Sequence, residues 1–260
     1  MIKVLHVTYD MRIGGTEMVI KNIIEGCDNK SFQLSIYCIE PNLGPWGQEL
    51  MDRGLTVSIY ERRQGFDFSL IKALRKYIRD NNIDIIHCHQ YTPWVYGALA
   101  SLMLNTKVLF TEHGRFYPDT TSWKRRLVNP ILSFLTDGIT VIAKATKQAL
   151  VEYEFLKEER IKVVYNGIKA VNVDKSRCAI LRSSLKIPVN DHVIGTIARL
   201  DPIKNQAMLL SSLALVLKEI NNVTLLIVGD GEEREQLEEL AKKLGVREQV
   251  IFAGYKPDPY

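Results

Sequence analysis

Two turns of the sequence combine residue types that can hold a phosphate group. The first reads DMRIGGTE, where Gly14 and Gly15 permit close backbone approach and Thr16 can cap the helix that follows. Free N–H groups and the helix dipole at such a start can bind a phosphate oxygen. A Gly-Gly pair alone is equally typical of a tight turn that binds no ligand.

The second turn reads GTIARLDPIKN and places two cations beside a predicted helix start. A strand at 192–198 delivers Arg199 at its carboxyl edge, and Lys204 is predicted to enter the next helix about one turn later. Fixed cations and a helix dipole can stabilise the charge that a diphosphate gains when its bond to a sugar breaks, without a metal. In isolation, the two residues are also compatible with ordinary surface charge.

A pair of histidines suggests a different chemistry. His87 and His89 in the segment HCH alternate on a predicted strand and so share one face, which would permit metal ligation. Because no third ligand is evident from the sequence, packed or cleft-lining histidines are the favoured interpretation. The sequence also lacks an Asp-x-Asp segment, the usual metal-diphosphate clamp. We therefore predict a site that needs no metal and no other cofactor.

The composition is that of a folded protein in a reducing compartment such as the cytoplasm. Of the 260 residues, 46% are hydrophobic and 25% are charged, close to average globular usage. The 34 basic and 30 acidic residues leave a net charge of +4, too small to indicate nucleic acid as a partner. The cysteines are far apart and form no C-x-x-C pair, which argues against a zinc knuckle or a disulfide framework: Cys27, Cys38, Cys88 and Cys178.

The N-terminal stretch IKVLHVTYD is predicted to be a first strand. His6 and Asp10 stand where a signal peptide would keep its apolar segment and cleavage site. The longest apolar run, at 94–104, is shorter than the roughly 20 residues that cross a bilayer. Any membrane contact is therefore expected to be peripheral.

Short β-branched runs alternate with segments of helical period, which is the pattern of parallel βαβ units. Residues 1–170 are predicted to form one Rossmann-like, doubly wound domain. Residues 166–190 interrupt the pattern with NGI, a charged segment and Pro188, so 171–260 would supply about half of a second such domain. The predicted helices span 16–27, 47–52, 69–81, 93–104, 122–136, 144–153, 203–219 and 232–244.

Seven segments, taken together and in this order, resemble glycosyltransferase family 4. They read GGTE, DIIHCHQ, FTEHG, VVYNGI, GTIARLDPIKN, LLIVGDGEEREQLEELAKKLG and VIFAGY. The resemblance implies a GT-B fold, with two Rossmann-like lobes around a cleft, an acceptor side in 1–170 and a donor side in 171–260. It also implies retaining transfer of a hexose from a nucleoside-diphosphate sugar to a glycan, lipid-linked or small-molecule acceptor, in cell-surface polysaccharide or glycolipid synthesis.

The resemblance also assigns site residues. Arg199 and Lys204 would bind the donor diphosphate, and Gly14 with Gly15 would contact it from the other lobe. His113 of FTEHG would be the catalytic-site histidine beside the donor sugar.

The histidines implied by the resemblance have different places. In the family the leaving phosphate accepts the acceptor's proton during a front-face attack, so His113 is assigned a positioning role rather than that of a general base. His89 would lie near the acceptor side.

The family's acidic E-x7-E segment would lie downstream of Tyr260. We therefore expect the chain to be truncated within its donor domain and to be inactive as it stands. A nucleotide-sugar-binding module without turnover is the alternative. A dinucleotide oxidoreductase is disfavoured, because IGGTE and GDGEER both lack a full G-x-G-x-x-G fingerprint.

Basic residues gather in the first lobe, partly on the helix at 69–81 opposite an apolar stripe of Leu70, Leu74 and Ile78. A solvated basic face and a contact with an anionic membrane are both open interpretations, the latter because relatives glycosylate lipid-linked acceptors at the cytoplasmic leaflet. The residues are Arg62, Arg63, Lys72, Arg75, Lys76, Arg79, Lys124, Arg125 and Arg126.

Overall fold

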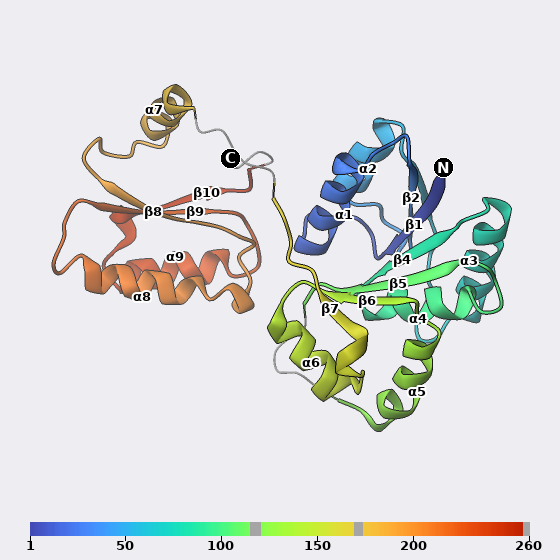
Figure 1. The fold of residues 1–260 in the computed structure, drawn as a ribbon. Helices are drawn as coiled ribbons and strands as arrows, with labels where there is room; N and C mark the ends of the chain where they lie inside the picture. Colours follow the sequence, from blue (N-terminus) through green and yellow to red (C-terminus); the bar gives the residue numbers. More distant parts are fainter. Residues whose placement is uncertain (115–120, 169–173, 257–260) are drawn as a thin grey trace. The chain divides into compact units, whose positions relative to one another are not determined.

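The computed structural model describes residues 1–114, 121–168 and 174–256. The chain divides into two compact units, unit 1 at Met1–Ile168 and unit 2 at Lys169–Tyr260 (Figure 1). Each unit has its own parallel sheet and its own hydrophobic core. The predicted class, parallel α/β with helices between the strands, is confirmed.

Unit 1 holds a seven-stranded parallel sheet in the order β3-β2-β1-β4-β5-β6-β7. The strands are β1 (Ile2–Thr8), β2 (Phe32–Cys38), β3 (Thr56–Ile59), β4 (Ile85–His89), β5 (Lys107–Glu112), β6 (Gly138–Val141) and β7 (Ile161–Val163). The order reverses between β1 and β4, and in sheets of this kind ligands bind beyond the carboxyl ends of the strands at that reversal.

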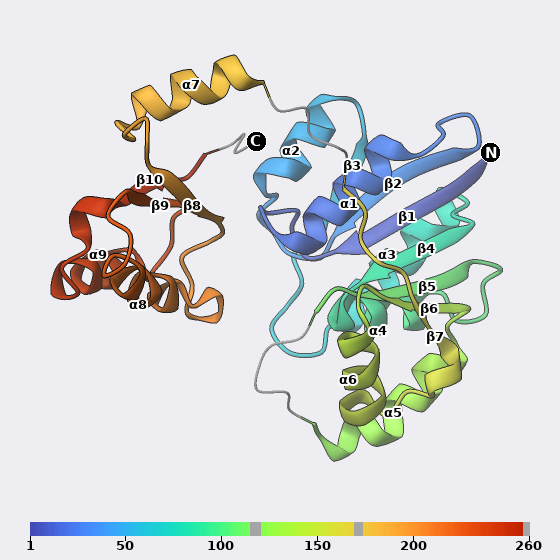
Figure 2. The same cartoon turned by 60° about the vertical axis from the view of Figure 1, so that its left-hand side comes forward.

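Helices cover both faces of this sheet (Figure 2). On one face, Ile20 of α1 packs against Ile36 of β2, and α2 lies beside α1. On the other face, α3 and α4 pack on Leu5 and Val7 of β1, together with parts of α5 and α6. The helices are α1 (Gly15–Gly26), α2 (Pro45–Asp52), α3 (Phe68–Asp80), α4 (Tyr91–Ala100), α5 (Trp123–Phe134) and α6 (Lys144–Glu154).

The apolar stripe predicted for the helix at 69–81 is confirmed. Leu70, Leu74 and Ile78 are buried along one side of α3. The helix begins where the Asp67 carboxylate accepts hydrogen bonds from the backbone N–H groups of Ser69 and Leu70.

Unit 2 has a three-stranded parallel sheet in the order β10-β9-β8, with β8 at one edge and mostly exposed. Leu210 of α8, Ile227 of β9 and Leu237 of α9 meet in its core. The elements are α7 (Lys175–Ser184), β8 (His192–Ile197), α8 (Gln206–Val216), β9 (Val223–Val228), α9 (Arg234–Lys243) and β10 (Val250–Gly254).

The sequence pattern missed α7, which lies in the segment expected to be irregular. The helix buries none of its residues and therefore has no apolar stripe that could reveal it. Its start is fixed by Asp174, whose carboxylate accepts from the backbone N–H groups of Ser176 and Arg177. A polar cap, rather than packing, defines this helix.

Candidate functional site

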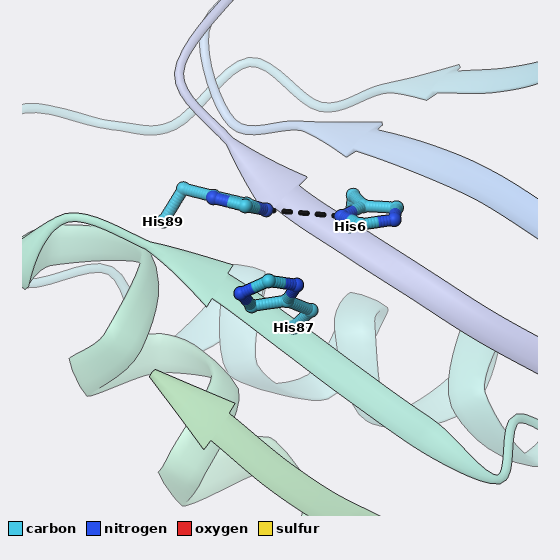
Figure 3. Close-up of side chains that lie close together, drawn as sticks. All are labelled: His6, His87 and His89. Carbon is cyan, nitrogen blue, oxygen red and sulfur yellow. Dashed lines mark hydrogen bonds between the residues drawn. The ribbon is translucent and has the colours of Figure 1, made fainter. Parts of the chain in front are cut away.

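Three histidines lie side by side on the sheet of unit 1. The parallel register pairs His6 of β1 with His87 of β4, and His89 follows two residues later on the same face (Figure 3). The alternation of side chains sends the neighbours of these residues, such as Val7 and Cys88, into the core under α3 and α4. The predicted shared face of His87 and His89 is thus confirmed, and β1 adds a third imidazole to it.

His6, His89 and His113 form what we call the histidine chain. The Nδ1 atom of His6 lies 3.0 Å from Nε2 of His89. The Nδ1 atom of His89 lies 2.8 Å from Nε2 of His113, which follows β5 directly. The sheet therefore connects the predicted catalytic-site histidine to a residue more than a hundred positions earlier in the sequence.

His87 belongs to a separate hydrogen-bonded row. Its Nε2 atom lies 2.7 Å from the Thr111 hydroxyl, which lies 2.6 Å from the Thr140 hydroxyl. Thr140 in turn donates to the backbone carbonyl of Phe110 at 3.4 Å. Although the rings of His87 and His89 have centroids 4.1 Å apart, no hydrogen bond joins them among the described contacts.

Burial keeps these imidazoles uncharged at neutral pH. It lowers the pKa of His6 and of His113 to about 4. Burial, and then the neighbouring imidazoles, lower the pKa of His87 and of His89 well below the usual 6.5. Each ring therefore has one N–H donor and one lone pair.

A metal ion is a second use for such rings. Nitrogen atoms of His6, His87 and His89 lie within 4.8 Å of one another, so His6 is the third ligand that was not evident from the sequence. It was missed because only the strand register brings it there. However, His89 already uses both of its nitrogens in the histidine chain, and His87 uses Nε2 with Thr111. A metal would have to displace hydrogen bonds that are already made.

The backbone is unusual at the same edge of the sheet. Gln90, directly after His89, has φ 71°, which is rare for a residue with a side chain, and donates its N–H to the carbonyl of Thr111. Gly114, directly after His113, has φ 147°, in the region that favours glycine. A strained backbone such as that of Gln90 is found at functional sites more often than elsewhere.

The glycine turn before α1 differs from its prediction. The helix begins at Gly15 with Gly14 as its N-cap, so Thr16 is a buried residue inside the helix and not its cap. A side chain at Gly15 would meet no other atom within 4 Å, which leaves open space over the helix start. At Gly14 the carboxylate of Glu17 fills that space, and burial raises the pKa of Glu17.

In unit 2 the two predicted cations lie after β8. Arg199 has a side chain 71% exposed and pairs with the carboxylate of Asp201. Lys204 is exposed and forms no ion pair with the described residues. The prediction that Lys204 enters the next helix was wrong, because it ends a short 3-10 turn at Pro202–Lys204 and Asn205, with φ 49°, separates this turn from α8. Lys204 has no ion-pair partner among the described residues, whereas Arg199 would have to leave Asp201 to bind a ligand.

Two glycines hold the segment that carries Arg199. A side chain at Gly229 would lie 2.0 Å from the carbonyl oxygen of Ala198, and one at Gly231 would lie 2.2 Å from that of Leu200. The backbone N–H of Leu200 also donates to the carbonyl of Asp230 at 3.0 Å. Sequence reasoning missed this role, although the segment GDGEE contained the signal. Only glycine allows this close approach of the two loops.

Comparison with known proteins bears on both units. The profile described as Glycosyltransferase Family 4 matches residues 13–170, and that described as Glycosyl transferases group 1 matches residues 179–260. The chain is 24% identical over 260 residues to the lipopolysaccharide core biosynthesis glycosyltransferase LpsD of Rhizobium meliloti, covering 99% of this chain and 68% of LpsD. It is 26% identical over 183 residues to the glycosyltransferase MJ1607 of Methanocaldococcus jannaschii, covering 66% of this chain and 46% of that protein.

The chain thus spans about half to two thirds of the length of these curated relatives. Its fold is similar to the crystal structure of Anabaena HepE in complex with UDP and glucose, with a TM-score of 0.82 and 21% identity over 99% of this chain and 70% of HepE. The architecture is therefore that of the GT-B glycosyltransferases, as predicted. The chain belongs to glycosyltransferase family 4, whose profile matches most of its length.

Proposed function

We propose that the whole protein, of which this chain carries unit 1 and the described part of unit 2, transfers a hexose from a nucleoside-diphosphate sugar, with retention of configuration, to a glycan, lipid-linked or small-molecule acceptor. One observation carries the proposal. In a family 4 chain, the exposed cations Arg199 and Lys204 follow the first strand of unit 2, and Gly229 and Gly231 hold their loop. Cations in this place can form charge-assisted hydrogen bonds with a diphosphate.

The proposed reaction breaks one bond and makes one. The acceptor oxygen attacks the anomeric carbon on the face from which the diphosphate departs, and the phosphate takes the acceptor's proton. Arg199 and Lys204 stabilise the charge on the leaving diphosphate, so the step is proposed to need no metal. His113, neutral because burial lowers its pKa to about 4, would position a sugar hydroxyl rather than remove a proton.

A donor panel tests the proposal. We would incubate the whole protein and a glycan or lipid-linked acceptor with UDP-, GDP- and dTDP-hexoses, beginning with UDP-glucose because HepE was solved with UDP and glucose. Release of the nucleoside diphosphate, with an anomeric proton of unchanged configuration in the NMR spectrum of the product, is the expected result. The Lys218→Ala variant, which removes an exposed cation elsewhere in unit 2, is the matched control for Arg199→Ala. Release with inverted configuration would contradict the proposed mechanism.

The acceptor proposal draws on helix α5. On its inner side Asn129 is fully buried and bonded to Glu154, whereas Trp123, Leu127 and Phe134 are 71%, 62% and 84% exposed. A helix with an apolar outer row and nearby cations can lie in the interface of an anionic bilayer. We propose that this row, rather than the basic side of α3, makes the peripheral membrane contact that a lipid-linked acceptor requires.

Several of the basic residues in unit 1 already have partners. Arg75 donates to the carbonyls of Ala100 and Leu102, and Lys76 pairs with Asp80. Among the described residues, no helix has both the length and the apolar character needed to cross a bilayer.

Sedimentation with vesicles tests the membrane contact. The protein should bind phosphatidylglycerol vesicles more than phosphatidylcholine vesicles, and the Phe134→Ser variant should lose most of this binding. The Phe66→Ser variant is the control, because Phe66 is also exposed but lies before α3. Equal loss in both variants would contradict the assignment to α5.

A further inference from the structure

The histidine chain has a property that follows from counting protons. A neutral imidazole donates through one nitrogen and accepts through the other. His89 uses both nitrogens, so if it accepts from His6 at Nε2 it must donate to His113 from Nδ1. If the hydrogen bonds run in the opposite direction, His113 donates from Nε2 to His89, and His89 donates from Nε2 to His6. All three residues must therefore have their proton on the same type of ring nitrogen.

The different burial of His6 and His113, the two ends of the histidine chain, favours one direction of hydrogen-bond donation. His6 is 1% exposed, and its Nε2 atom has no hydrogen-bond partner in the described part of the chain. Either direction leaves one N–H without a partner, on Nε2 of His6 or on Nδ1 of His113, and this costs less at His113, which is only partly buried. The unpaired Nε2 of His6 is then a lone pair, and the His6 proton is on Nδ1, facing His89.

The other end of the histidine chain is then a donor. His113 accepts at Nε2 from His89, so its own proton is on Nδ1. This Nδ1 atom also has no partner within the described residues. A buried N–H group without a partner is costly, and a hydroxyl oxygen of a bound sugar is a suitable acceptor for it.

We propose that His6 and His89 are positioning residues that fix His113 as an Nδ1–H donor aimed at a hydroxyl oxygen of the ligand. The idea that this ligand is the donor sugar rests on the proposed function, whereas the tautomer of His113 follows from the hydrogen bonds alone. Neither His6 nor His89 has exposed surface enough to touch a ligand, so both act through His113. The assignment of His89 to the acceptor side stays a prediction.

His87 offers an internal comparison on the same face of the sheet. Because Thr140 donates to the carbonyl of Phe110, the hydroxyl of Thr111 must donate to Thr140. The Thr111 oxygen can then only accept from His87, which must have its proton on Nε2. The structure thus assigns opposite tautomers to His87 and to the histidine chain, although their rings are in contact.

Long-range 1H–15N correlation spectra of the 15N-histidine-labelled protein at pH 7.5 test this directly. His6, His89 and His113 are expected as Nδ1–H tautomers and His87 as Nε2–H. Two different tautomers within the histidine chain, or His113 with its proton on Nε2, would overturn the proposal. A metal bound by these rings would also overturn it, and would appear as loss of these N–H signals that EDTA reverses.

Substitutions separate positioning from packing. In His6→Leu, His113 should become a mixture of tautomers, and kcat for donor cleavage should fall roughly 5- to 10-fold, the effect of one lost neutral hydrogen bond, with little change in KM. His6→Asn should restore both readouts, because its amide can donate from nearly the place of Nδ1. The matched control His87→Leu should leave the tautomer of His113 unchanged.

The outcomes distinguish the two proposals. If His87→Leu alters His113 as much as His6→Leu does, the role of the chain is only packing and the inference is wrong. If the tautomers are as assigned but His6→Leu cleaves the donor at the normal rate, the inference stands and the proposed role of His113 at the sugar fails. If His6→Leu does not fold, the spectra of the unsubstituted protein and of His6→Asn decide the question.

Discussion

In unit 1 the polar residues at the carboxyl edge of the sheet are buried and bonded to one another, whereas in unit 2 Arg199 and Lys204 project into solvent. The histidines are uncharged because burial lowers their pKa values, and their positions follow from the strand register. In unit 2 the backbone near Arg199 is closely packed, where Gly229 and Gly231 meet Ala198 and Leu200.

This difference separates two ways of preparing a site. A neutral donor built into a sheet has a fixed direction before any ligand arrives, but its removal disturbs the core. An exposed cation contributes little to folding, because surface ion pairs are worth roughly 0 to 1 kcal/mol, yet it can form strong charge-assisted contacts with a ligand. Substitutions in unit 1 should therefore affect stability, and those in unit 2 should affect binding.

The largest expected effect is the loss of both cations. In Arg199→Ala/Lys204→Ala, the affinity for UDP should fall roughly 100-fold or more, since each charge-assisted contact contributes about 1.5 to 3 kcal/mol. The melting temperature should change by less than a degree or so, because both side chains are exposed. Calorimetric titration and thermal melting measure the two quantities, with Lys218→Ala as the control. Normal affinity in the double variant would show that the two residues are ordinary surface charges.

The second-largest effect is expected in unit 1, where a substitution should change the stability of the fold. His89→Ala should lower the free energy of unfolding by about 3 kcal/mol, because it leaves nitrogen atoms of His6 and His113 buried without partners. Urea titration followed by tryptophan fluorescence reports on this unit, since all 3 tryptophans lie in it. Lys204→Ala should leave the same transition unchanged. Equal stability of His89→Ala and the unsubstituted protein would show that the buried histidines of unit 1 contribute no more to folding than the exposed cations of unit 2.

The third effect is a dependence of unit 1 on pH. Burial lowers the pKa of His6 to about 4, whereas the unfolded chain has a value near 6.5. Between these values the unfolded state binds a proton that the folded state does not, so this contribution is fully present above pH 6.5 and is lost as the pH falls toward 4. His87, His89 and His113 act in the same direction.

Each such histidine should lower the free energy of unfolding by at most about 1.4 kcal/mol per pH unit in this window. Urea titrations at pH 7.5, 6 and 5, followed by tryptophan fluorescence, measure the slope. His6→Leu, which lacks one of the four groups, should give a shallower slope. A free energy of unfolding that does not fall between pH 7.5 and 5 would show that these histidines are not buried in the neutral form.

The smallest effect on stability is expected at the start of α1. Gly15→Ala should change the free energy of unfolding by less than about 1 kcal/mol, because the new methyl group meets no atom and alanine favours a helix. If the helix start holds a phosphate oxygen, the same change should weaken UDP binding several-fold. Gly26→Ala at the other end of α1 has equally open space and is the matched control. Equal UDP affinity in both variants would remove Gly15 from the site.

The features that the sequence could predict are those that depend on residues close together in the chain. Alternating periods predicted most of the strands and helices, whereas the binding role assigned to Arg199 and Lys204 stays a prediction. The histidine chain could not be predicted in this way, because His6 reaches His89 only through the pairing of β1 with β4. Likewise, α7 has no buried face to reveal it, and the role of Gly229 depends on the approach of a loop from β8.

We propose that this family 4 chain binds a nucleoside diphosphate through cations rather than through a metal. Isothermal titration of the protein with UDP, once in buffer with EDTA and once with magnesium, tests it most directly. We predict the same affinity in both buffers, with the affinity decreasing as salt is added because the contacts are charged. Binding that disappears in EDTA and returns with magnesium would contradict binding through cations alone. It would make His6, His87 and His89 the first candidates for metal ligands.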